Sequence, residues 1–334
     1  MLTEKENFLE AIKKDGHPDR LANGYDAFRV IGGDPVGQFV RGNRIKGTDS
    51  YDRWGCFISW PDDQLRAIPI VTPENQVIQD IEEWQKYVKV PDLRGNCSTG
   101  WETAIENKKK IQEEGCIATT IMGTGIFEEL HMLMTFEDTL VNLLAYPDEM
   151  HELIDVIYEY RMEYFRLIVE NLHPDAIISH DDWGSKDQML MSPETWREFF
   201  KEPYRKIYKY LHDNDVLILH HSDSYNEPIA VDMEEIGIDI WQGVVPSNDI
   251  VSIAGKLKGN MALMGGIDSI LDREDTQMEE VQAEINRCCD TYGHLKQFIP
   301  SWTYGDPNTL YPHVKDLISE AITNWNKAHY DLDW

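Results

Sequence analysis

The chain has 334 residues, 42% of them hydrophobic and 27% charged, and its formal net charge is −29. This composition allows a sizeable core and excludes a disordered chain. A surface this acidic disfavours binding to nucleic acid or to anionic membranes. The sequence has no long apolar stretch and no signal-peptide core, so we expect a cytoplasmic protein. Its five cysteines include no C-x-x-C pair, which argues against a disulfide framework and a four-cysteine zinc site.

Short apolar runs alternate with helical patterns along the chain, which predicts parallel β–α units. A first strand is expected over 19–25, and a second, less regular one within 51–60. The later strands are predicted at 117–121, 176–179, 216–219, 238–241, 262–264 and 297–299.

Helical segments separate these runs. One helical face is predicted from apolar side chains that recur every three or four residues. They are Leu153, Ile157, Tyr160, Tyr164 and Ile168. Ser192-Pro193 predicts the start of another helix, because a serine cap is followed by proline in the first turn.

Eight such units closing into a (β/α)8 TIM barrel are the most economical interpretation, with residues 1–334 forming a single domain. Residues 31–75 are rich in glycine and proline and are predicted to be an irregular N-terminal insertion near the barrel mouth. An open, doubly wound sheet is the alternative, but no glycine-rich dinucleotide-binding turn follows a predicted strand.

Titratable side chains follow two neighbouring predicted strands, where the catalytic loops of such a barrel lie. The candidate catalytic residues are His180, Asp181, Asp182, His221 and Asp223. His221 and Asp223 are two positions apart, so an extended backbone would point both the same way. Together with Asp181 or Asp182 they would form a cluster that can bind a metal or act as acid and base. Any single aspartate here could instead be a helix cap.

Aromatic residues at the same strand ends predict a flat, mostly apolar slot for a planar neutral ring. The candidate substrate-binding residues are Tyr25, Trp183, His220, Trp241, Gln242, Trp302 and Tyr304. Two alternatives stay open. The tryptophans could be ordinary packing at the barrel mouth, and His220 could point into the barrel wall.

A resemblance to the uroporphyrinogen decarboxylase superfamily rests on four strings of residues. They are His180-Asp181-Asp182-Trp183-Gly184-Ser185, Met191-Ser192-Pro193-Glu194, His221-Ser222-Asp223 and Ile236-Gly237-Ile238-Asp239. Residues 220–225 and 237–243 resemble most the methyltransferase component of aryl methyl ether (veratrol-type) O-demethylases of anaerobic bacteria. The resemblance implies a (β/α)8 barrel that moves a methyl group from a methoxylated aromatic compound to the cobalt of a separate corrinoid protein.

Two other branches of the superfamily resemble the chain less. The decarboxylase binds a substrate with eight carboxylates through an arginine-rich N-terminal motif, whereas the arginines here are dispersed. They are Arg20, Arg29, Arg41 and Arg44. The thiol-alkylating relatives hold zinc with a His-x-Cys pair, which here reads His221-x-Asp223. A decarboxylase-like enzyme and a small-molecule-binding barrel without catalysis remain the alternatives.

The resemblance also implies how an aryl oxide would leave. A phenoxide departs more easily when its oxygen is protonated or bound by a Lewis acid. We therefore expect His221, Asp223 and one of Asp181 or Asp182 to surround that oxygen. If a zinc ion is present, His221 and Asp223 are its predicted ligands. The expected partner is a corrinoid protein, and a homo-oligomer is compatible with this interpretation.

A rival metal set follows from the Glu-x14-Glu-x20-His pattern associated with O-demethylase methyltransferases. Glu137, Glu152 and His173 match this spacing. The two glutamates open helical stretches, and His173 precedes a predicted strand, at the end of the barrel opposite the catalytic loops. A capping or surface role for these three residues is therefore the preferred interpretation.

Overall fold

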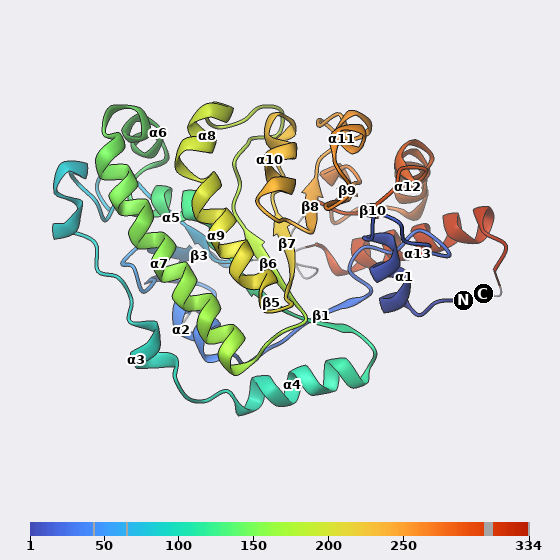
Figure 1. Cartoon of the computed structure of the whole chain (residues 1–334), viewed down its shortest axis with the longest axis horizontal. Helices are drawn as coiled ribbons and strands as arrows, with labels where there is room; N and C mark the ends of the chain where they lie inside the picture. Colours follow the sequence, from blue (N-terminus) through green and yellow to red (C-terminus); the bar gives the residue numbers. More distant parts are fainter. Residues whose placement is uncertain (43, 65, 304–309, 333–334) are drawn as a thin grey trace.

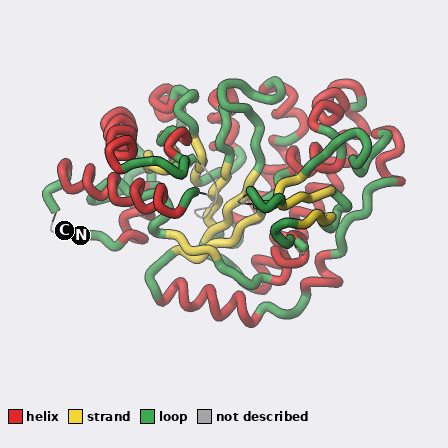
Figure 2. Tube along the Cα trace, turned by 180° about the vertical axis from the view of Figure 1, so that it is seen from behind, coloured by secondary structure: helices red, strands yellow, loops and turns green. Residues whose placement is uncertain are grey.

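The computed structural model describes residues 1–42, 44–64, 66–303 and 310–332. Its centre is a parallel sheet of seven strands in the order β1-β5-β6-β7-β8-β9-β10. Their bounds are β1 Phe28–Val30, β5 Ile117–Met122, β6 Ala176–His180, β7 Leu217–His221, β8 Ile240–Val244, β9 Ala262–Gly266 and β10 Phe298–Ser301. The sheet curls into an incomplete barrel, and helices surround it (Figures 1 and 2). The predicted α/β barrel class is confirmed, with seven parallel strands among the described residues rather than the expected eight.

The helices follow the strands along the chain as the sequence pattern predicts. Their bounds are α1 Glu4–Ala11, α2 Pro35–Arg41, α3 Leu93–Cys97, α4 Glu102–Glu113, α5 Ile126–Leu133, α6 Phe136–Ala145, α7 Pro147–Asn171, α8 Pro193–Phe199, α9 Lys201–His212, α10 Ala230–Glu235, α11 Ile250–Lys256, α12 Met278–Tyr292 and α13 Pro312–His329. Short 3-10 helices span Ile81–Lys86, Glu227–Ile229 and Ser269–Leu271. The five residues of the predicted apolar face on α7 are all buried. Ser192 caps α8 by accepting a hydrogen bond from the backbone N–H of Thr195.

The first strand lies later in the chain than predicted. Residues 19–25 contain no strand, and β1 begins at Phe28 instead. The backbone of Leu21 is already hydrogen bonded, because its N–H donates to Asn326 Oδ1 at 3.2 Å and its carbonyl accepts from Asn326 Nδ2 at 3.0 Å. Gly24, in the left-handed region with φ +42°, passes close to Ser301 of β10. The segment thus occupies the space beside β10 through side-chain bonds to α13 rather than a strand ladder.

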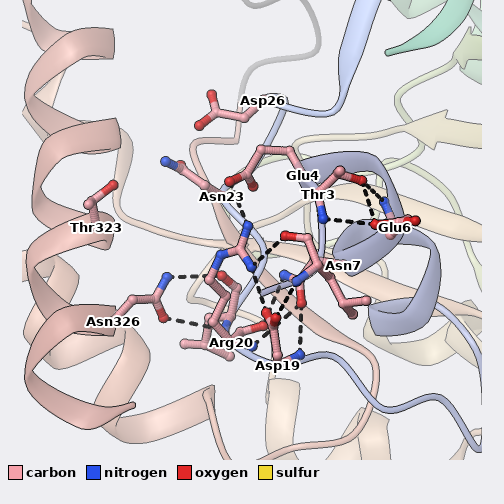
Figure 3. Close-up of polar contacts among 12 residues, drawn as sticks. Thr3, Glu4, Glu6, Asn7, Asp19, Arg20, Asn23, Asp26, Thr323 and Asn326 are labelled. Atoms are coloured by element: carbon pink, nitrogen blue, oxygen red, sulfur yellow. Dashed lines mark hydrogen bonds and ion pairs between the residues drawn. The ribbon is translucent and has the colours of Figure 1, made fainter. Parts of the chain in front are cut away.

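Arg20 fixes the same segment to α1. Its guanidinium is only 4% exposed and pairs with Glu4 at 2.6 Å and Asp19 at 2.5 Å. Asn7 of α1 adds a hydrogen bond to the Arg20 carbonyl at 3.1 Å, and Asn326 lies on the other side of the segment (Figure 3). The N-terminal segment and α13 are therefore held together by buried polar groups.

Replacing Asn326 with alanine is expected to lower the free energy of unfolding by about 1–3 kcal/mol, because it leaves buried backbone groups of Leu21 without partners. Urea unfolding followed by circular dichroism measures this loss. Asn324→Ala is the matched control, since Asn324 is exposed on the same helix and should cost little. Equal stabilities for the two variants would contradict the role assigned to Asn326.

The segment 31–75 is more regular than expected. It contains α2 and an antiparallel sheet of three strands, β2 Thr48–Tyr51, β3 Phe57–Trp60 and β4 Ile68–Pro69. The strand predicted within 51–60 exists as β3, but it belongs to this small sheet and not to the barrel. The single domain stays a prediction. In the part of the chain that the structure describes, no helix has the length and apolar character needed to cross a membrane.

Candidate active site

Three polar side chains stand next to one another across the ends of neighbouring strands. In the strand register, His180 of β6 pairs with His221 of β7, and His221 pairs with Gln242 of β8. The residues just before them, His220 among them, face the other side of the sheet because side chains alternate along a strand. The two histidines that follow the apolar run of β7 therefore have different environments.

The imidazoles of His180 and His221 meet the carboxylate of Asp182. One ligand atom from each of these three residues lies within 4.8 Å of the others. The two imidazole rings are 4.6 Å apart between centroids, and His180 Nε2 lies 3.2 Å from Asp182 Oδ2. The side chains of His180 and Asp182 are 27% and 29% exposed, so the cluster is partly open to solvent.

Both histidines have their Nδ1 atoms fixed by an oxygen acceptor. His180 Nδ1 donates to the carbonyl of Gly123 at 2.8 Å. His221 Nδ1 lies 2.5 Å from Gln242 Oε1, and Gln242 Nε2 donates to the carbonyl of Trp302 at 3.1 Å. The amide orientation makes Oε1 the acceptor, so His221 carries its proton on Nδ1. Each Nε2 is then the atom that can bind a metal, as is usual when a second oxygen orients a histidine ligand.

Asp182 is held as an anion in this cluster. Ser222 Oγ donates to Asp182 Oδ1 at 3.0 Å, and the backbone N–H of Asp223 donates to the same oxygen at 3.1 Å. Burial acts to raise the pKa of Asp182, but the hydrogen bond and charge of His180 outweigh it and leave the pKa well below its usual range. Oδ2 of Asp182 therefore faces the His180 imidazole as a negatively charged oxygen.

The two imidazoles differ in charge. Burial lowers the pKa of His221 to about 4, and the neighbouring positive charge of His180 acts in the same direction. Burial also opposes a charge on His180, but the carboxylates of Glu128 and Asp182 raise its pKa to about 10. The metal-free site thus holds a neutral His221 beside a protonated His180, and a metal ion would replace the proton on His180.

Asp223 does not join the two imidazoles, although the sequence pattern predicted a His221–Asp223 pair. Strand β7 ends at His221, so the extended alternation on which that pairing depended does not continue. Asp182 takes the expected place of Asp223 in the cluster. Burial and the charge of Asp182 raise the pKa of the Asp223 carboxyl to about 6. Asp223 therefore remains a candidate for proton transfer beside the cluster.

Asp181 is buried and bonded in a way that gives it a structural role. Its carboxylate is fully buried and accepts hydrogen bonds from the backbone N–H groups of Phe127 and Glu128, from Trp183 Nε1 and from the Tyr204 hydroxyl, at 2.6–3.0 Å. Burial raises the pKa of Asp181 although these bonds act in the opposite direction. The carboxylate caps the first turn of α5 and ties it to the end of β6.

Three of the predicted substrate-binding residues are packed into the wall of the barrel: Trp183, His220 and Trp241. Trp183 and Trp241 are fully buried. The ring of His220 stacks on Trp183 with centroids 4.3 Å apart, and its Nδ1 lies 2.6 Å from the Tyr208 hydroxyl. His220 therefore faces α9, which is the barrel-wall alternative.

Three further predicted substrate-binding residues are also buried: Tyr25, Gln242 and Trp302. Tyr25 and Trp302 pack against each other with ring centroids 5.3 Å apart, and both are almost completely buried. Gln242 orients His221 through its Oε1 atom. Tyr304 lies outside the described residues.

The structure does not bring together the rival set. Glu137 lies in the first turn of α6, Glu152 lies early in α7, and His173 follows the end of α7. The axis of α7 places Glu152 and His173 roughly 30 Å apart at 1.5 Å per residue. Glu152 accepts a hydrogen bond from Gln85. One metal ion cannot bind both residues of the same chain.

Sequence reasoning missed several groups that complete the site. Glu128 Oε2 lies 3.4 Å from His180 Nδ1, and its pKa is raised to about 7, chiefly by burial. The carbonyl of Gly123 and the hydroxyl of Ser222 orient His180 and Asp182. Gly123 and Ser222 directly follow β5 and β7, and Glu128 lies in the first turn of the helix after β5, so their positions were the available signal.

Gln242→Met is expected to weaken metal binding roughly 10- to 100-fold, because His221 loses the acceptor that orients it. Isothermal titration of the metal-free protein with Zn²⁺ measures the change. Gln282→Met, a similar replacement on α12 far from the cluster, serves as the control. An unchanged affinity in Gln242→Met would show that the contact with Gln242 does not support metal binding.

A parallel α/β barrel with an imidazole–carboxylate cluster at the carboxyl ends of its strands is the class of protein that this fold and site define. The sequence profile described as uroporphyrinogen decarboxylase (URO-D) matches residues 53–321, so the chain belongs to that family.

Among solved structures, a methyltransferase from Methanosarcina mazei is similar in fold, with a TM-score of 0.61 and 17% sequence identity. The similarity covers 81% of this chain and 76% of that one. No curated protein matches the chain significantly.

Proposed function

We propose that the protein is a methyltransferase that moves a methyl group from a methoxylated aromatic compound to the cobalt of a corrinoid protein. The observation that carries this proposal is the cluster of His180, Asp182 and His221, whose potential ligand atoms lie within 4.8 Å of one another while the Nδ1 atoms of both histidines are fixed by oxygen acceptors. Membership of the URO-D family and the fold similarity to a methyltransferase support it.

The residues of the cluster fit a catalytic zinc ion. Two imidazoles and one carboxylate are a donor set that such sites use, with a further position left for substrate. When bound, Zn²⁺ would supply a Lewis acid for the ether oxygen. The chain itself orients the ligands through Gly123, Gln242 and Ser222. Asp223, with a pKa of about 6, would carry a proton for the departing aryl oxide.

A decarboxylase acting on a substrate with many carboxylates is less well supported, although the family profile carries that name. Arg20 is buried and paired with Glu4 and Asp19, so it cannot also bind substrate carboxylates. Arg29 donates to the carbonyls of Asp26 and Phe28. The acidic balance of the whole chain points the same way.

The test combines the purified protein, a methoxylated aromatic compound such as a dimethoxybenzene, and a reduced corrinoid protein. Methyl transfer would change the cobalt absorption spectrum and release one phenol for each methyl group. A parallel incubation with uroporphyrinogen tests for carbon dioxide release. Spectra that do not change with any of a panel of methoxylated rings and corrinoid proteins, together with carbon dioxide release, would overturn the proposal in favour of the decarboxylase.

A further inference from the structure

A second cluster of potential ligands lies between the small antiparallel sheet and α5. One ligand atom from each of Asp52, Cys56 and Glu129 lies within 4.8 Å of the others. Asp52 follows β2, Cys56 precedes β3, and Glu129 belongs to α5. The cluster shares no residue with the His180 site. It brings together two parts of the chain that are distant in sequence.

Glu129 is a buried acid with an unmatched oxygen. Its side chain is 5% exposed, and Oε1 has no hydrogen-bond partner. Arg161, the positive charge that acts on Glu129, directs its terminal nitrogens to the carbonyl of Thr124 and to Ser179 Oγ instead. A buried oxygen without a partner is costly, and a bound cation would remove that cost.

The loop that carries Asp52 and Cys56 is already arranged around Glu129. Asp52 Oδ1 accepts hydrogen bonds from the backbone N–H groups of Trp54 at 2.9 Å and Cys56 at 2.8 Å. Both bonds go to Oδ1, so Oδ2 is the oxygen that can turn to an ion. Burial and the charge of Glu129 raise the pKa of the Cys56 thiol. Without a cation, the Cys56 thiol and the Glu129 carboxyl therefore do not both ionise readily.

Space is available beside the cluster. Glu129 and Tyr160 both line a cavity of about 110 Å³ between α2, α5 and α7, enough for a few water molecules. The hydroxyl of Tyr160 is buried and also lacks a hydrogen-bond partner. A water molecule bound to a metal at Glu129 could accept or donate at this hydroxyl.

We propose that Asp52, Cys56 and Glu129 bind a second divalent cation, for which one thiolate and two carboxylates best match zinc. Binding displaces the protons of Cys56 and Glu129 to solvent, and water completes the coordination. The ion joins the loop before β3 to α5, whose first turn carries Glu128 of the active site. This site is independent of the proposed methyl transfer.

Cobalt(II) distinguishes the two clusters, because only the second one contains sulfur. The metal-free full-length chain is titrated with Co²⁺, and the near-ultraviolet thiolate-to-cobalt absorption is recorded. The band is expected in the wild type, in His221→Ala and in Cys97→Ser, which removes another buried thiol. It should be absent from Cys56→Ser, and Glu129→Gln should need roughly tenfold more cobalt. Added Zn²⁺ should bleach the band.

A wild-type chain without the band, or a band that survives in Cys56→Ser, would overturn the second site. If Cys56→Ser does not fold, as judged by circular dichroism, Glu129→Gln decides the matter, and an unchanged cobalt titration in that variant would also overturn the proposal. Loss of metal in His221→Ala alone bears only on the methyl-transfer site. The two proposals can therefore fail separately.

Discussion

The His221→Ala variant is expected to transfer methyl groups roughly a thousand-fold more slowly than the wild type. His221 is a proposed ligand that is held ready to bind, since Gln242 orients it and burial keeps it neutral with a pKa of about 4. Loss of a Lewis acid from the leaving oxygen costs several kcal/mol of transition-state stabilisation, and about 1.4 kcal/mol corresponds to each factor of ten in rate. Stopped-flow measurement of the methyl-cobalt absorption with a saturating methoxylated ring gives the rate.

Two controls make this result specific. His212→Ala removes an imidazole whose ion pair with Asp239 lies on the outside of the barrel, and it should keep the wild-type rate. Metal content, measured on the same samples, should fall in His221→Ala and not in His212→Ala. A His221→Ala chain that retains full activity would contradict the assignment of the cluster to catalysis.

The sequence predicted where the polar strand ends converge, because strand ends are visible as sharp changes from apolar to polar residues. The predicted strands at 176–179 and 216–219 correspond to β6 and β7, and both end in the histidines of the cluster. Because β6 and β7 are neighbouring parallel strands, their carboxyl ends lie side by side, and the details of the helices between them do not change this. The prediction that polar groups converge at one edge therefore needed only local patterns.

The direction of individual side chains could not be read in the same way. His220 and His221 are two consecutive histidines, and the contacts of His220 with Trp183 and with Tyr208 of α9 decide which one faces the helices. Asp181 and Asp182 pose the same problem, since one caps α5 and the other faces the imidazoles. These assignments depend on contacts between segments far apart in the chain, which a single sequence does not contain.

The prediction of the first strand was wrong for a related reason. Residues 19–25 have a plausible strand pattern, but Asn326, about three hundred residues later, hydrogen bonds to the backbone of Leu21. The side chain of Asn23 makes similar bonds to Ser319. Tertiary contacts of this kind override local propensity.

Variants of Asp181 and Asp182 should separate a role in stability from a role in catalysis. Asp181→Ala is expected to lower the free energy of unfolding by at least about 3 kcal/mol, because buried donors on α5, Trp183 and Tyr204 lose their common acceptor. Gly125 shows how tightly this capping site is packed, since a side chain there would collide with the Asp181 carboxyl group. Guanidinium unfolding followed by tryptophan fluorescence measures the loss.

Asp182→Asn should behave in the opposite way. An asparagine oxygen can still accept from Ser222 and from the backbone of Asp223, so stability should change by less than about 1 kcal/mol. The neutral amide is a much poorer metal ligand than a carboxylate, so zinc content and methyl transfer should both fall sharply. An Asp181→Ala chain of normal stability but without activity would reverse these two roles, because it would make Asp181 the reacting carboxylate and leave Asp182 as a structural neighbour.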